Sequence, residues 1–358
     1  MLFREPRSLH PGADSRAFGP GMETVMKMRR LGAQGPTVSA IGLGCMRMSN
    51  FLGSNAVENR NSDEDGIATI HAALDAGVNL LDTGDFYGMG HNEMLVGRAI
   101  KGRRDDAVIS VKFGAQKSHN GAFLGFDSRP NSVKNFAAYS LQRLGVDVID
   151  IYQPGRIDPN VPVEDTVGAI ADLIQEGKVR FLGLSEASPE HIRRAHAVHP
   201  VAALEIEYSL ATRLIEPEIL PTARELGIGI VAYSVVAQGL LLGNIEGPLP
   251  ADDPRGQLFP RFQGDNLLHN LERVAVLKEL AAAKGISPAQ IAIAWVLSRG
   301  GDIVPLVGMS RPSRLPENLA TLDIQLSPDE LATLDKAFAP GAIIGDRQPT
   351  QFKHLAPE

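Results

Sequence analysis

The sequence is poor in the features that build disulfides, membrane spans or nucleic-acid surfaces. Its single cysteine, Cys45, excludes an intrachain disulfide, a thiolate metal cluster and a CxxC redox pair, so we expect a reducing, cytoplasmic location. We find neither a signal peptide in residues 1–25 nor an apolar run of roughly 18 residues, the length of a membrane span. A net charge of -7 without a long Lys/Arg run argues against nucleic-acid and membrane partners, so the expected partner is a small molecule.

What the sequence does contain is an alternation of short apolar runs with longer segments of helical periodicity. Eight apolar runs predict strands at residues 40–43, 78–81, 108–111, 148–152, 180–184, 202–206, 228–232 and 303–306. Helices are predicted at residues 64–76, 132–144, 164–176, 189–198, 216–226 and 271–284, several of them ending at a glycine. A doubly wound sheet also fits this alternation, but eight evenly spaced units over about 300 residues favour an α/β fold of the (β/α)8 TIM-barrel type.

The predicted barrel occupies most of the chain. We expect a disordered leader at residues 1–25, one barrel domain at residues 26–345 and a C-terminal tail at residues 346–358. Two long segments, residues 116–128 and 243–270, predict loops on the face where the carboxyl ends of the strands lie. Because such barrels carry their chemistry on that face, we expect these loops to determine substrate specificity.

Three polar side chains follow neighbouring predicted strands. The stretch LDTGDFYGMGHNE places Asp82 and Tyr87 after the second strand, and VISVK ends the third strand with Lys112. Side chains alternate along a strand, so Asp82 and Lys112 can both point into the barrel mouth. An ammonium group lowers the pKa of a nearby phenol from about 10, and a carboxylate keeps the lysine charged. Singly, these residues suggest a structural ion pair and a loop aromatic, but together they predict a general acid.

These motifs resemble the aldo-keto reductase family, in the branch related to potassium-channel β subunits, over residues 28–339. RRLG and VSAIGLGCM are similar to the family's N-terminal β-hairpin and first strand, LDTGDFYGMGHNE to its Asp/Tyr motif, and VISVKFG to its Lys motif. The resemblance implies NADPH/NADP+ as the cofactor and Asp82, Tyr87 and Lys112 as catalytic residues. The implied reaction is reduction of an aldehyde or ketone, or the reverse oxidation, with a proton from Tyr87 and a hydride from the nicotinamide.

The resemblance also implies a cofactor site assembled from several strand ends. GMSRPSRLPENL is similar to the family's adenosine-phosphate loop, and two arginines in four residues suit a phosphate because guanidinium groups bind its oxygens in pairs. An isolated RPSR would more simply be a solvated basic turn. The implied cofactor-binding residues are Gly44, Cys45, Met46, Asp82, Ser185, Glu186, Glu205, Tyr233, Ser234, Val236, Gln238, Gly239, Ser310, Arg311, Arg314, Glu317 and Asn318.

The chain departs from the family pattern at one catalytic position. In IDIYQPGRIDP, Gly155 stands where the family commonly has a histidine that orients the carbonyl. Gln153, on the same strand face, or a water molecule is the expected substitute donor. The missing histidine keeps open a second interpretation, a nicotinamide-binding regulatory or sensor protein with little turnover. The histidines lack HExxH spacing, so we expect no metal. The sequence indicates neither the particular substrate nor the oligomeric state.

Overall fold

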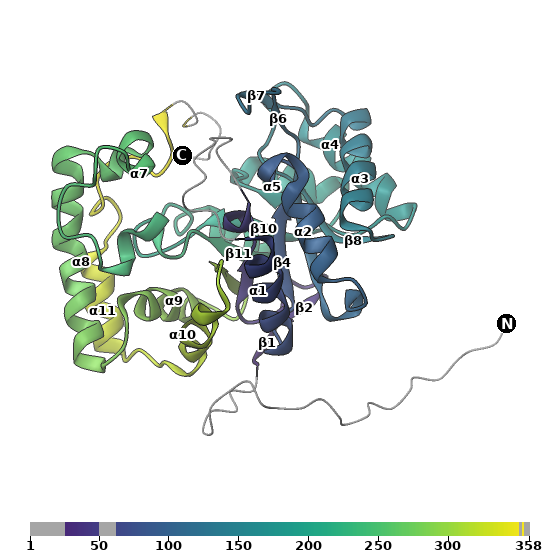
Figure 1. The fold of residues 1–358 in the computed structure, drawn as a ribbon. Helices are drawn as coiled ribbons and strands as arrows, with labels where there is room; N and C mark the ends of the chain where they lie inside the picture. Colours follow the sequence, from purple (N-terminus) through teal and green to yellow (C-terminus); the bar gives the residue numbers. More distant parts are fainter. Residues whose placement is uncertain (1–25, 50–61, 351–352, 354–358) are drawn as a thin grey trace.

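The strands of this chain close into a barrel. A computed structural model describes residues 26–49, 62–350 and 353, so the predicted leader lies outside the described residues. Within them, parallel strands close in the order β10-β11-β12-β3-β4-β5-β8-β9, which confirms the predicted (β/α)8 barrel (Figure 1). These strands are β3 (Gly42–Gly44), β4 (Leu80–Gly84), β5 (Val108–Phe113), β8 (Ile149–Pro154), β9 (Val179–Ser185), β10 (Val201–Glu207), β11 (Gly229–Tyr233) and β12 (Ile303–Gly308).

Helices cover the outside of the barrel. In Figure 1, α2, α3 and α4 lie to one side of the strands, and α8 and α11 lie to the other. None of the described helices is by itself long and apolar enough to cross a membrane. Among them, only the pair α8 (Gly264–Lys284) and α9 (Pro288–Ser298) has the length and composition of a membrane span when taken together, and this pair is bent by 96°. The helices are α1 (Asp63–Asp75), α2 (His91–Ala99), α3 (Pro130–Leu144), α4 (Val163–Gln175), α5 (Pro189–Val198), α6 (Ile219–Glu225), α7 (Pro254–Leu258), α8 (Gly264–Lys284), α9 (Pro288–Ser298), α10 (Leu315–Leu319) and α11 (Pro328–Ala337).

Local sequence sets the ends of these helices. A serine hydroxyl accepts a hydrogen bond from the first-turn backbone at α5, α9 and α11, and a proline follows each of these serines. At the other end, Gly145 closes α3 with φ of 65°, a left-handed conformation that side chains disfavour. All the glycines that we predicted to end helices have positive φ, namely Gly77, Gly145, Gly177, Gly227 and Gly285.

Two hairpins lie at opposite ends of the barrel (Figure 1). The antiparallel pair β1 (Met28–Arg30) and β2 (Thr37–Ser39) confirms the predicted N-terminal hairpin. Leu31 and Val38 from this hairpin pack with apolar strand side chains in a small core inside the barrel, which closes its amino end. At the other end, β6 (Ala115–Lys117) pairs with β7 (Phe123–Phe126), so most of the predicted loop at residues 116–128 is a hairpin.

The predicted loop at residues 243–270 is also more ordered than its sequence suggested. It contains α7, the 3-10 turn η6 (Pro260–Phe262) and the beginning of α8. The buried amide of Asn270 donates to the carbonyls of Arg261 and Ile344, and the Ile344 backbone N–H donates back to it. Asn270 therefore holds the C-terminal segment against this loop.

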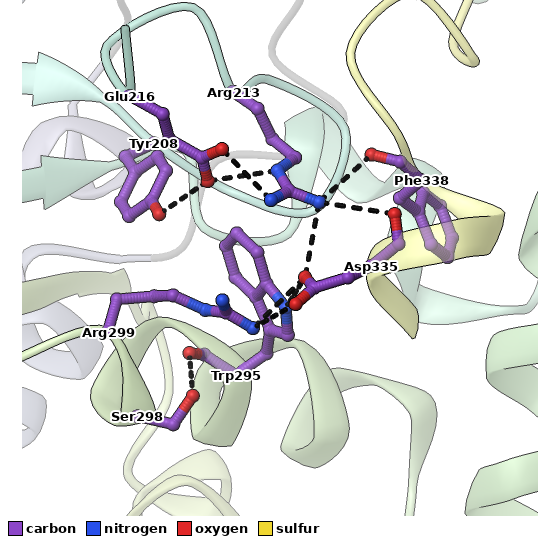
Figure 2. A network of polar contacts seen from close by, with 8 residues as sticks. All are labelled: Tyr208, Arg213, Glu216, Trp295, Ser298, Arg299, Asp335 and Phe338. Carbon is purple, nitrogen blue, oxygen red and sulfur yellow. Dashed lines mark hydrogen bonds and ion pairs between the residues drawn. The ribbon is translucent and has the colours of Figure 1, made fainter. Parts of the chain in front are cut away.

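Helix α11, which precedes the C-terminal segment, is attached to the barrel through Asp335 (Figure 2). Its carboxylate accepts hydrogen bonds from Arg213 at 3.1 Å, Arg299 at 3.0 Å and the Trp295 indole at 3.0 Å. The Arg299 guanidinium also lies 4.2 Å from the centre of the Trp295 ring, a cation–π contact. This network fixes the point from which the C-terminal segment runs back toward the carboxyl end of the strands.

Candidate active site

The structure brings together the three side chains predicted to form the acid. Strands β4 and β5 pair with Asp82 opposite Ser110 and Gly84 opposite Lys112. This register places the Lys112 ammonium 2.6 Å from both oxygens of Asp82, in a position where both residues are buried. Tyr87 lies in the turn that follows β4, and its ring centre is 5.3 Å from the ammonium. The buried lysine remains charged because the carboxylates next to it raise its pKa by more than burial lowers it.

The pKa of Tyr87 differs from the sequence-based expectation. Burial raises the pKa of this phenol above its usual value, the Lys112 charge lowers it, and the carboxylates of Asp82 and Glu205 raise it again. The lysine thus acts in the predicted direction, but burial and the two carboxylates outweigh it. In the structure Tyr87 is therefore a protonated, neutral phenol over the physiological pH range.

A second carboxylate shares the same lysine. Glu205, near the carboxyl end of β10, lies 3.0 Å from the Lys112 ammonium. Burial and the nearby Glu205 charge raise the pKa of Asp82 well above its usual range, in spite of the lysine. Two carboxylates and one ammonium give this inner group a charge of -1 when all three are ionised.

Gln153 does not offer the free donor that we expected. Its amide nitrogen donates to Glu205 at 2.6 Å and to the Ser110 hydroxyl at 3.1 Å, so both of its N–H groups are used. There is also little space for a side chain at Gly155, the position of the missing histidine. A Cβ atom there would lie 3.3 Å from the Phe86 ring and 3.4 Å from the Phe126 ring. Aromatic edges therefore border the place of the histidine.

A second charged group, which sequence reasoning missed, lies at the ends of β9 and β10. Arg347, in the predicted C-terminal tail, binds the buried carboxylates of Glu186 and Glu207. Arg261 approaches Glu207 at 3.4 Å from the 243–270 segment. The Tyr233 hydroxyl donates to Glu186 at 2.8 Å, which fixes the orientation of the tyrosine ring. Nothing in the sequence pattern links Arg347 to these glutamates, since they are more than 100 residues apart in the chain.

The predicted cofactor residues after β9 and β11 show two signs of a binding site. Glu186, Ser234 and Gln238 have φ of 52°, 57° and 52°, a conformation that is strained for residues other than glycine and is concentrated at functional sites. The Ser185 hydroxyl and the side-chain amide oxygen of Gln238 are buried without a hydrogen-bond partner among the described residues. Buried polar atoms of this kind are suited to a bound polar ligand.

The predicted adenosine-phosphate residues lie after β12. Arg311 and Arg314 are exposed in and next to the 3-10 turn η7 (Pro312–Arg314), and Ser310 is half-buried before it. Glu317 and Asn318 follow in α10, and Glu317 forms an exposed ion pair with Arg314 at 3.3 Å. The turn therefore presents two guanidinium groups at the rim of the barrel.

The remaining predicted cofactor residues come from the ends of β3 and β11. Gly44 pairs with Asp82 across the sheet, and the Cys45 backbone N–H donates to the Asp82 carbonyl at 2.9 Å. The Cys45 thiol is fully buried and burial raises its pKa, so the thiol is unreactive. Met46 lies in the turn η1 (Met46–Met48). Val236 and Gly239 lie before and within the turn η5 (Ala237–Leu242).

The fold and this site define a (β/α)8-barrel protein whose polar centre lies at the carboxyl ends of its strands. The chain belongs to the aldo/keto reductase family, whose model matches residues 40–339, and it is therefore an oxidoreductase. Among the described residues, no three His, Cys, Asp or Glu side chains cluster in a way that could hold a metal ion. The absence of a metal stays a prediction.

Individual relatives agree with this assignment. The chain is 40% identical to "Probable aldo-keto reductase 1" of Glycine max over 329 residues, which cover 91% of this chain and 93% of the relative. Among solved structures, it is similar to a glycerol dehydrogenase from Gluconobacter oxydans with a TM-score of 0.79 and 31% identity, covering 87% of this chain and 95% of the other. It is also similar to an aldo/keto reductase from Klebsiella pneumoniae in complex with NADP and acetate, with a TM-score of 0.67 and 28% identity, covering 90% and 99%.

Proposed function

We propose that the protein is an NADPH-dependent reductase of an aldehyde or ketone, working in the cytoplasm, with Tyr87 as the proton donor. The observation that carries the proposal is the buried Lys112 ammonium, which contacts Asp82 at 2.6 Å and lies next to the Tyr87 ring. A neutral phenol of raised pKa holds its proton until a carbonyl oxygen gains negative charge, and the lysine then stabilises the phenolate that remains. Asp82 keeps the lysine charged and directs it.

The cofactor proposal rests on the fit of the residues present. Ser185 and Gln238 offer buried polar atoms without partners, and the Tyr233 ring is held by Glu186 at the same end of the barrel. Arg311 and Arg314 offer guanidinium groups for a 2′-phosphate. When bound, NADPH supplies the hydride that reduces the carbonyl carbon. The remaining residues proposed to hold it are Gly44, Cys45, Met46, Asp82, Glu186, Glu205, Ser234, Val236, Gly239, Ser310, Glu317 and Asn318.

Two relatives bear on the cofactor and on the direction of the reaction. The Klebsiella pneumoniae enzyme was solved with NADP, which supports a nicotinamide cofactor here. The Gluconobacter oxydans relative is named for the oxidation of an alcohol, glycerol. Activity should therefore be measured in both directions, with aldehydes and ketones plus NADPH and with alcohols plus NADP+.

The decisive experiment replaces Tyr87 by phenylalanine, which removes the hydroxyl and keeps the ring. We expect Tyr87→Phe to bind NADPH as tightly as the native protein and to lose roughly 10²–10⁴-fold in kcat, the usual contribution of a general acid. Stopped-flow measurement of NADPH oxidation with an aromatic aldehyde, together with fluorescence titration of NADPH, separates the two quantities. An unchanged kcat would show that another group donates the proton.

A sensor function is the second candidate, and one observation favours it. Gly155 offers no side-chain donor, and the Gln153 donors are engaged with Glu205 and Ser110. A sensor would bind NADPH tightly and turn over no member of a broad panel of aldehydes, ketones and sugars. Turnover that depends on Tyr87 excludes this candidate.

A further inference from the structure

The C-terminal segment after α11 reaches the mouth of the barrel and places a buried arginine, Arg347, there. Its backbone is anchored two residues earlier, because Gly345 has φ of 84° and a Cβ at this position would lie 2.6 Å from the backbone nitrogen of Arg261. Asn270 holds the neighbouring Ile344 through hydrogen bonds in both directions. The segment therefore delivers the guanidinium group to a fixed position.

Arg347 joins the ends of two neighbouring strands. Its guanidinium binds both carboxylate oxygens of Glu186, directly after β9, and lies 3.2 Å from the carboxylate of Glu207, the last residue of β10. Both carboxylates are buried, and Arg347 is the only cation paired with Glu186 among the described residues. A buried carboxylate that loses its cation is costly, so Arg347 fixes the position of the Glu186 side chain.

Glu186 in turn holds the ring of Tyr233. One of its oxygens accepts hydrogen bonds from the Tyr233 hydroxyl at 2.8 Å and from the Glu207 backbone N–H at 3.0 Å. The Glu186 backbone has φ of 52°, a strained conformation that persists only where the surrounding contacts fix it. The Tyr233 ring also packs against the small core inside the barrel and remains half-buried. The ring is thus held by packing and through its hydroxyl, and part of its surface stays accessible.

This tyrosine lies next to the reacting groups. In the register of β10 and β11, Tyr233 pairs with Glu207, two residues beyond Glu205 toward the carboxyl end. Glu205 contacts the Lys112 ammonium at 3.0 Å, so the tyrosine lies just beyond the level of the lysine. A proton and a hydride go to neighbouring atoms of one carbonyl group, so a nicotinamide that supplies the hydride has to lie near the acid and near Tyr233.

Resting on the proposed NADPH site, we propose that Arg347 is a positioning residue for the nicotinamide half of the cofactor. It fixes Glu186, and Glu186 fixes the Tyr233 ring, which restricts the orientation of a flat ring that packs against it. The buried Ser185 hydroxyl, which has no partner among the described residues, precedes Glu186 and offers a polar contact at the same place. None of these contacts involves Arg314, which lies after β12 at the proposed adenosine half.

The test compares NADPH with 2′,5′-ADP, which has the adenosine and the 2′-phosphate but no nicotinamide. Calorimetric titration gives the dissociation constants of both for the native protein, Arg347→Met and Tyr233→Phe. We expect Arg347→Met to weaken NADPH binding by roughly three- to tenfold, which corresponds to loss of an oriented aromatic pair, and to leave 2′,5′-ADP binding unchanged. Tyr233→Phe removes only the hydroxyl and should give the same pattern.

A double variant and a control show whether Arg347 acts through the tyrosine. Both single substitutions break one chain of contacts, so we expect the double variant to bind NADPH no more weakly than the weaker of the two single variants. The control is Arg213→Met, because Arg213 also pairs with two carboxylates and ties α11 to the barrel, but makes no ion pair with Glu186. This variant should bind NADPH as the native protein does, even where urea titration shows it to be less stable.

Several results would refute the role of Arg347. They are unchanged NADPH binding in Arg347→Met, equal weakening of NADPH and 2′,5′-ADP in that variant, losses that add in the double variant, or the same loss in Arg213→Met. These measurements require no turnover. Failure of the native protein to reduce any carbonyl compound, combined with the expected binding results, would refute only the proposed reductase function.

Discussion

Removing the second carboxylate from Lys112 should change the pH at which the site works. Glu205 contacts the ammonium at 3.0 Å and raises the pKa of Tyr87, so Glu205→Gln should lower the pKa of the phenol. Glutamine has nearly the same shape and keeps an oxygen that accepts the hydrogen bond from Gln153. Asp82 still contacts the lysine through both oxygens, so Lys112 stays charged in the variant.

The size of the effect follows from the contact that is lost. A hydrogen bond between charged groups contributes about 1.5–3 kcal/mol, and 1.4 kcal/mol corresponds to one pKa unit. If that stabilisation becomes available to the Tyr87 phenolate, its pKa falls by about one to two units. Oxidation of an alcohol needs the phenolate as a base, so the rise of kcat/KM with pH should move down by the same amount.

The assay is alcohol oxidation with NADP+ between pH 6 and pH 11, measured for the native protein, Glu205→Gln and Glu205→Asp. The aspartate variant keeps the charge and controls for altered packing. If kcat/KM rises at the same pH in the native protein and in Glu205→Gln, Glu205 does not influence the pKa of Tyr87. If the pH of this rise shifts in Glu205→Asp alone, the cause is altered geometry and not the lost charge.

Three other predictions concern cofactor choice and stability. Arg314→Ala should weaken NADPH binding roughly ten- to a hundredfold and leave NADH binding nearly unchanged in fluorescence titrations. Equal losses of affinity for NADPH and NADH would indicate a folding defect. We do not expect such a defect, because the Arg314–Glu317 ion pair is exposed and contributes little to stability. Burial and the nearby Glu93 charge raise the pKa of Asp85 to about 8, so the contribution of Asp85 to the free energy of unfolding is fully present below about pH 4 and is lost as the pH rises through about 8. Asp85→Asn should flatten this dependence in urea titrations at pH 5, 7 and 9, and an unaltered slope would exclude Asp85 as its source. Asp335→Asn should lower the free energy of unfolding by about 1.5–3 kcal/mol in the same urea assay, because arginine side chains lose a charged acceptor; a smaller change than about 0.5 kcal/mol would mean that solvent already screens this network.

Most of the fold could be predicted because it depends on local pattern. Each of the eight predicted strands overlaps a barrel strand, and the serine caps and terminal glycines act within one turn of the chain. Helix α9 was not predicted, since it is buried on nearly every side and lacks the polar face that gives a helical period. The short α7 was missed because its five residues are too few to show a period.

The candidate site also has a part that could be predicted from the sequence and a part that could not. Asp82, Tyr87 and Lys112 could be placed together because β4 and β5 are adjacent and their register fixes which residues meet. The resemblance also implied Glu186 and Glu205 as cofactor-binding residues, but the sequence does not show what their carboxylates contact. Those contacts depend on residues brought from far away in the chain, such as Arg347 at Glu186. The direction of the Tyr87 pKa shift depends on the same packing, since burial is its largest cause.

The two charged groups of the site are held by different parts of the chain, so we expect a substitution that alters one group to leave the other in place. The inner group, around Lys112, is held by strand ends whose positions the barrel fixes. The outer group consists of Glu186 and Glu207 with Arg347 and Arg261. Its two arginines approach from the C-terminal segment and the 243–270 segment. Asn270 joins these two segments through hydrogen bonds to both, so we expect a substitution there to displace both arginines. We therefore expect substitutions in the two segments to change the outer group without displacing Asp82, Lys112 or Tyr87.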